Sequence, residues 1–139
     1  MSGAGGGGRR RRGRELALRV LFELEGTDKD AAAALAYQGE EMGATADVRG
    51  FARRLVIGCL EHREHIDATL ATASRWSLID LGKVERAALR LGAEELLFGG
   101  GTPVAVVVDE WLELTRAYAG DEAVHYVNGV LGQISRERV

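Results

Sequence analysis

Apolar residues recur every three or four positions along most of this sequence, and glycine rather than proline interrupts the pattern. The 139 residues include 19 glycines and a single proline. Glycine ends helices without steric cost, so helices joined by glycine-containing turns are the predicted elements. We therefore expect an all-α protein that forms a compact bundle of about seven helices.

The spacing predicts where these helices lie. Their ranges are 10–25, 29–42, two segments of 48–70 with a break near 61–63, 83–98, 103–118, and a last helix from 121. The β-branched run at 104–108 alone favours a strand. The flanking residues favour a helix there instead. Thr102 suits the N-cap position and Pro103 the first helical position, and the residues that follow continue a helical pattern of polar and apolar side chains.

Residues 83–98 are apolar on most sides, which predicts a buried central helix. One exposed stripe is expected on it, made of Lys83, Arg86, Arg90 and Glu94. The predicted domain covers 9–139 and follows a disordered glycine-rich leader at 1–8. The single cysteine, Cys59, lies in an apolar run and is expected to be buried. With no membrane-length apolar run and no signal-peptide pattern, we expect a cytoplasmic protein without a membrane partner.

Charge is distributed unevenly along the sequence. The first 20 residues hold six arginines and one glutamate, whereas the remainder holds 12 basic and 20 acidic residues. Arginine outnumbers lysine 16 to 2. A guanidinium grips phosphate with two hydrogen bonds and stacks on bases, so the basic segment suits single-stranded RNA. Alternatively, this basic segment is only a solvated run of charges without a binding role.

Catalytic and metal-binding patterns are weak. His62 and His65 lie beside glutamates, but their spacing matches neither zincin motif, and a solvated helix turn is expected there. No G-x-S-x-G motif or phosphate-binding loop is present, and adjacent carboxylates do not converge on a helix. We expect no metal, no cofactor and no enzymatic activity.

The first predicted helix has two faces. Leu16, Val20 and Leu21 mark the core face. The opposite face is part basic and part apolar; it holds Arg11, Arg14, Leu18 and Phe22. This second face either packs inside the bundle or meets a partner. In the last helix, His125, Asn128, Gly129 and Gly132 share one face. Its glycines either allow close approach of another backbone or are surface glycines without a special role.

Several segments match one known family in order and spacing. They are RRRGRELAL at 10–18, WSL at 76–78, L..VER..LR at 81–90, ELL at 95–97, the helix after Pro103, and YVNGVL at 126–131. Together they resemble the NusB family of transcription antitermination factors. The resemblance implies two three-helix halves around the buried central helix. It also implies binding of the boxA element of ribosomal RNA transcripts together with the ribosomal protein NusE, within the antitermination complex on RNA polymerase.

The resemblance also implies roles for individual residues. Those on the RNA side are Arg10, Arg11, Arg14, Glu122 and Tyr126, and those facing NusE are Phe22 and Glu85. Some members of the family pair as homodimers in isolation. Gly13 stands where the family usually has alanine, which should loosen the start of the first helix.

Other departures concern partner binding. Phe22 stands where tyrosine is common, and Ala105 and Asp109 replace a usual lysine and asparagine. An RNA cytosine methyltransferase also carries a NusB-like domain, but its α/β cofactor domain has no counterpart in this sequence. An interaction-only helical module without specific RNA binding is the remaining alternative to the RNA-binding adaptor.

Overall fold

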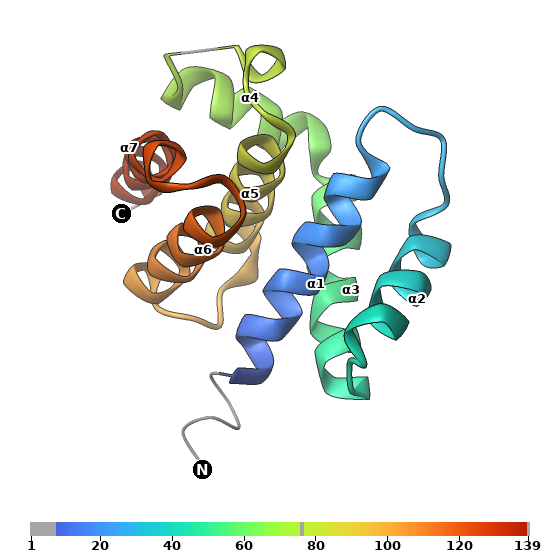
Figure 1. The fold of residues 1–139 in the computed structure, drawn as a ribbon. Helices are drawn as coiled ribbons and strands as arrows, with labels where there is room; N and C mark the ends of the chain where they lie inside the picture. The colour runs from blue at the N-terminus through green and yellow to red at the C-terminus, as the bar shows by residue number, and fades with distance from the viewer. Residues whose placement is uncertain (1–7, 76, 139) are drawn as a thin grey trace. The chain divides into compact units, whose positions relative to one another are not determined.

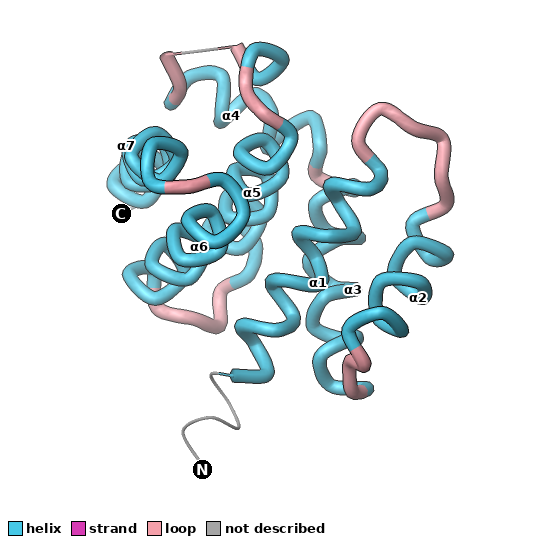
Figure 2. The backbone as a smooth tube through the Cα atoms, viewed as in Figure 1, coloured by secondary structure: helices cyan, strands magenta, loops and turns pink. Residues whose placement is uncertain are grey.

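Helices make up the regular structure of this protein in the residues that the computed structural model describes, 8–75 and 77–138 (Figures 1 and 2). Seven α-helices are present there, without strands, which confirms the all-α prediction. They are α1 (Arg9–Leu24), α2 (Ala31–Met42), α3 (Ala46–Glu61), α4 (Arg63–Ala73), α5 (Lys83–Glu94), α6 (Val104–Ala119) and α7 (Asp121–Arg138). Residues 1–7 of the predicted leader and Trp76 of the WSL segment lie outside the described residues.

The helices group into two compact units, and the division falls between Ile57 and Gly58, inside α3. In the first unit α1 packs against α2, and the predicted core face of α1 is buried. The Asp30 side chain accepts a hydrogen bond from the backbone N–H of Ala33 and so begins α2. Gly43, with φ of 60°, ends α2 in the left-handed conformation that glycine adopts most easily.

In the second unit α4, α6 and α7 pack against α5 (Figure 1). The side chains of α5 are buried without interruption from Ala87 to its end, which confirms the predicted buried helix. The predicted exposed stripe is wrong for two of its members, since Arg90 and Glu94 are each 7% exposed. Arg90 donates two hydrogen bonds to the Asp67 carboxylate, at 2.9 and 3.2 Å, and this ion pair replaces the lost hydration.

The turn between α3 and α4 is exposed at Glu61 and at 63–65, as the sequence predicts, but His62 within it is half-buried. Its ring stacks on Phe98 with centroids 3.8 Å apart. Its Nδ1 lies 2.8 Å from Oε1 of Glu94. A Cβ on Gly58 would clash with the Glu94 carboxylate, so glycine at this position makes room for the pair. A spacing rule for metal motifs carries no information about such a structural pairing.

The β-branched run at 104–108 is helical, as predicted from the flanking residues, and begins α6. Pro103, however, is the N-cap rather than the first helical residue. Its φ of −57° suits a helix, but its ψ of 143° is extended, so the helix starts one residue later. None of the described helices is long and apolar enough to cross a membrane.

Cys59 is buried in α3, as predicted, with 1% of its surface exposed. Burial raises the pKa of its thiol to about 12, and the Glu94 carboxylate contributes in the same direction. The thiolate, which is the reactive form, is therefore scarce at neutral pH.

We expect Cys59 to resist iodoacetamide at about pH 8 in the folded protein and to react in denaturant. Mass spectrometry of the intact chain measures this, and rapid labelling of the folded protein would contradict it.

Glu94 makes the stability of the fold depend on pH. Burial raises the pKa of Glu94 above its ordinary value of 4.5, while the hydrogen bond with His62 opposes the rise. The folded protein then holds this proton more tightly than the unfolded chain. The free energy of unfolding therefore falls as pH rises from 4.5 through the raised pKa.

Replacing the carboxyl removes this dependence. We expect wild-type protein to lose stability relative to Glu94→Gln between about pH 4 and about pH 8, as measured by urea denaturation. Glu113→Gln, which changes an exposed carboxylate of α6, is the control and should show no such trend. A stability difference that stays constant over this interval would show that Glu94 does not titrate as argued.

Candidate nucleic-acid interface

Four consecutive arginines, Arg9 to Arg12, form the first turn of α1, and all four are exposed. No acidic residue lies in that turn. The N-terminus of a helix carries the positive end of its dipole, so cations there are unfavourable and anions are favoured. Arg9 and Arg12 contact other elements of the first unit. Arg9 pairs with Asp47 at 2.9 Å, and Arg12 donates to the carbonyl oxygen of Met42 at the end of α2.

Phe51 of α3 lies against this part of α1. The guanidinium carbons of Arg10, Arg14 and Arg54 lie 5.6, 5.3 and 5.9 Å from the centroid of its ring. These distances place three cations within range of one aromatic ring. The close approach depends on Gly13, because a Cβ there would lie 2.5 Å from Cδ2 of Phe51. Gly13, which is predicted to loosen the start of α1, thus also allows Phe51 of α3 to pack closely against that helix.

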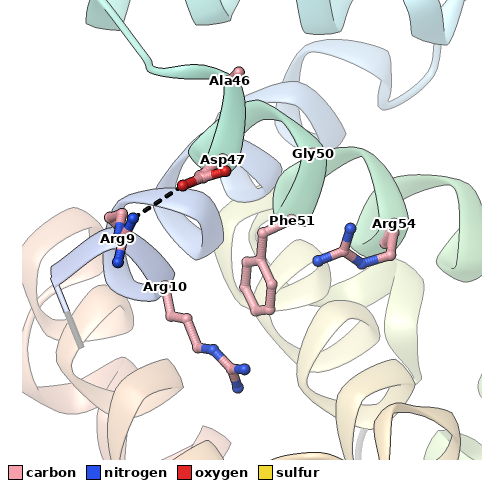
Figure 3. A pocket seen from close by; sticks show the side chains of 7 residues that line it. All are labelled: Arg9, Arg10, Ala46, Asp47, Gly50, Phe51 and Arg54. Carbon is pink, nitrogen blue, oxygen red and sulfur yellow. Dashed lines mark hydrogen bonds and ion pairs between the residues drawn. The ribbon is translucent and has the colours of Figure 1, made fainter. Parts of the chain in front are cut away.

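A hollow of about 550 Å³, the Phe51 hollow, opens beside these residues (Figure 3). Its lining residues are Arg9, Arg10, Ala46, Asp47, Gly50, Phe51 and Arg54. The last four lie at i, i+3, i+4 and i+7 of α3 and so share one helical face. The hollow therefore combines cations from two helices with part of an aromatic ring.

The three arginines predicted for RNA binding lie in different environments. Arg10 is exposed and lines the Phe51 hollow, and Arg11 is exposed on the same turn. Arg14 is 2% exposed, and its guanidinium faces the Phe51 ring. The second face of α1 is therefore mixed: Arg14 and Leu18 are buried, while Arg11 and Phe22 are exposed.

In the second unit, Glu122 and Tyr126 lie one turn apart on α7 and line a second hollow, the Tyr126 hollow, of about 620 Å³. The other lining residues are Thr72, Ala73, Arg75, His125, Gly129, Val130 and Gln133. Tyr126 is half-buried, and its hydroxyl forms a hydrogen bond with Ser74 Oγ. Glu122 and His125 are exposed beside it. The hollow thus presents an aromatic ring, a carboxylate, an imidazole and a guanidinium.

The two residues predicted to face NusE belong to different units. Phe22 is 45% exposed near the end of α1. Glu85 is half-buried in the first turn of α5. A Cβ on Gly82 would clash with its carboxylate, so the side chain folds back toward the start of the helix, where a negative charge is favourable.

Sequence analysis missed Asp47, Phe51, Arg54 and Arg75 as lining residues of these hollows. Phe51 is one of the recurring apolar residues of the predicted helical segments at 48–70. The i, i+3, i+4, i+7 spacing from Asp47 to Arg54 was a signal for a second, charged face of that helix. Among the residues that the structure describes, no group of three or more histidine, cysteine or acidic side chains could hold a metal ion.

Residues 11–136 match the model of the NusB family. Two proteins called transcription antitermination protein NusB are each 40% identical to this chain. The one from Lysinibacillus sphaericus matches over 130 residues, 93% of this chain and 98% of that protein. The one from Heliobacterium modesticaldum matches over 129 residues, 92% of this chain, but the chain spans only 63% of that protein's length.

Solved structures agree with the sequence matches. A chain in the crystal structure of antitermination factors NusB and NusE in complex with dsRNA has a TM-score of 0.86 and 31% identity, covering 93% of this chain and 97% of that chain. T. maritima NusB has a TM-score of 0.84 and 33% identity, covering 92% of this chain and 91% of that chain.

The contact between Gly13 and Phe51 predicts how α1 tolerates substitution. Alanine usually stabilises a helix interior by about 1 kcal/mol over glycine. At Gly13 the added Cβ would force Phe51 to move, and such overpacking costs about 1–3 kcal/mol. We therefore expect Gly13→Ala to lower the free energy of unfolding. Gly129→Ala, on α7 with nothing within 4 Å of the added Cβ, should raise it and serves as the control. Urea denaturation measures both, and equal effects would show that Phe51 adjusts without cost.

Proposed function

Because this chain belongs to the NusB family, we propose that it is a transcription antitermination factor that binds boxA RNA of ribosomal RNA transcripts together with NusE. It acts as a cytoplasmic adaptor without catalytic activity. The relatives that carry the name antitermination protein support this assignment, as does the solved complex of NusB and NusE with dsRNA.

The arginine turn of α1 is the observation that carries the proposal. Four exposed arginines gather at the positive end of a helix dipole, with no acidic residue in that turn. This arrangement costs stability in the free protein, and phosphate groups would relieve the cost by supplying negative charge. Arg10 and Arg11 of this turn are the proposed phosphate ligands. Such contacts hold a nucleic acid in place without reading its sequence.

The Tyr126 hollow supplies groups that can read a base. The Tyr126 ring offers a stacking surface, and stacking on an aromatic ring is the usual way in which single-stranded RNA is held. The Glu122 carboxylate can accept a hydrogen bond from an exocyclic amino group, whereas it would repel a phosphate. We assign base recognition to this hollow for that reason.

Arg14 takes a different role from the one that the family resemblance implies. Its side chain is buried and lies over the Phe51 ring, so it is not presented to a phosphate. We propose that Arg14 is a positioning residue that holds Phe51, while Arg10 and Arg11 contact the RNA. The exposed ring of Phe22 and the Glu85 carboxylate remain the proposed contacts for NusE.

Fluorescence anisotropy with a labelled boxA RNA and a scrambled RNA of equal composition tests the proposal. We expect tighter binding of boxA than of the scrambled RNA, a larger difference when NusE is present, and weaker binding as salt rises from about 50 to about 200 mM. Arg10→Gln and Arg11→Gln should weaken binding of both RNAs about equally. Each should lower the salt slope by about 0.7, the value for one single-strand phosphate.

The controls separate RNA binding from NusE binding. Phe22→Ala should leave RNA binding by the protein alone unchanged and should reduce the enhancement by NusE, because the substitution lies outside both hollows. Equal affinity for the two RNAs in the presence of NusE would contradict sequence-specific binding. Binding of NusE without any RNA binding would favour an interaction-only helical module.

A further inference from the structure

Helix α3 presents a charged aromatic face to the start of α1. In the Phe51 hollow, α1 contributes Arg9 and Arg10, and α3 contributes Phe51 and Arg54. Figure 3 shows the Phe51 ring between Arg10 and Arg54, while Arg9 turns to Asp47. The acidic residue of the hollow thus neutralises Arg9, and the charges of Arg10 and Arg54 lie on either side of the ring.

The cations around Phe51 repel one another. The guanidinium carbons of Arg10, Arg14 and Arg54 all lie within 6 Å of one ring centroid, and the electron-rich face of a single ring offsets only part of this repulsion. Within the described part of the chain, Arg54 makes no hydrogen bond or ion pair, although its side chain is exposed. An anion bound by both Arg10 and Arg54 would offset this repulsion and give Arg54 an ionic partner.

The size and lining of the hollow indicate which anion it suits. At Gly50 an added Cβ would make no contact closer than 3.8 Å, to Nη1 of Arg54, so small residues keep this side open. The hollow offers little apolar surface beyond Phe51, so it is a poor docking site for an amphipathic protein helix. Guanidinium groups beside an aromatic ring match a nucleotide, whose phosphate and base need these two kinds of group.

We propose that Arg54 and Arg10 bind the same RNA phosphate across the Phe51 hollow, which makes α3 a second RNA-contacting element beside the arginine turn of α1. Phe51 positions the two guanidiniums through its ring. The proposal rests on the RNA-binding function proposed for the chain and adds one residue, Arg54, to the phosphate ligands.

Arg54→Gln, with Arg53→Gln as its matched control, tests the proposal by anisotropy with labelled boxA RNA. Both substitutions remove one exposed arginine from α3, but Arg53 does not line the hollow. We expect Arg54→Gln to weaken RNA binding about fivefold and to lower the salt slope by less than the value of about 0.7 for a whole phosphate, because Arg10 still contacts the shared phosphate. Arg53→Gln should change the affinity less than about twofold and leave the slope unchanged, since long-range charge alone is screened.

The double variant Arg10→Gln/Arg54→Gln tests whether the two arginines share one phosphate. If they do, the loss of affinity in the double variant is smaller than the product of the two single losses, because the second substitution removes a contact that the first has already weakened. Losses that multiply would overturn the shared phosphate. Circular dichroism of each variant confirms that the helices are intact.

The remaining outcomes separate this proposal from the proposed function. If the wild-type protein binds RNA and Arg54→Gln binds equally well, α3 is not an RNA-contacting element, and the wider function stands. If the wild-type protein fails to bind RNA at low salt, both are overturned.

A labelled oligoglutamate peptide is the second probe. If Arg54→Gln weakens peptide binding as much as RNA binding, the hollow is a general polyanion site and its assignment to RNA is overturned.

Discussion

Three buried ionisable side chains at the C-terminal end of α5 constrain the second unit: Arg90 and Glu94 lie on the helix, and Glu95 follows it directly. Removing a charge from water without a partner costs several kcal/mol, so each of these side chains needs a partner at a fixed place. Their partners are Asp67 of α4, His62 at the junction of α3 and α4, and the indole Nε1 of Trp111 of α6, respectively. A helix that is otherwise apolar could slide or rotate against its neighbours, whereas these contacts fix its register.

Glycines inside helices allow two close contacts between side chains and helix backbones in this protein. Gly58 leaves room for the Glu94 carboxylate, and Gly13 leaves room for the Phe51 ring. Glycine in a helix interior costs about 1 kcal/mol of helix stability relative to alanine. In both places the missing Cβ leaves room for the neighbouring side chain. In the second unit the result is a paired buried charge. In the first unit it is an aromatic ring held among guanidiniums.

Local periodicity predicted the helices well, since an apolar stripe and a glycine stop are properties of neighbouring residues. Local periodicity failed for side chains whose contact partners lie far away in the sequence. The stripe through Arg90 and Glu94 has the same i, i+4 spacing whether it faces water or buried partners, and the sequence does not show Asp67 or His62 meeting it. The pairing of Phe51 with Gly13 was hidden for the same reason, because 38 residues separate them.

The two hollows differ in chemistry, and in the proposed function this difference separates the residues that supply affinity for RNA from those that supply specificity. The Phe51 hollow combines guanidiniums with one ring and suits phosphate, which is the same at every nucleotide. The Tyr126 hollow combines a ring with a carboxylate, and a carboxylate distinguishes bases that carry an amino group from those that do not. Arginines alone would bind any RNA, and their hold would weaken steeply with salt. A base-reading surface without them would lack the electrostatic attraction that brings RNA to it. The proposed function therefore needs both hollows for selective binding. The residues that the family resemblance implies, Arg10, Glu122 and Tyr126, include a member of each.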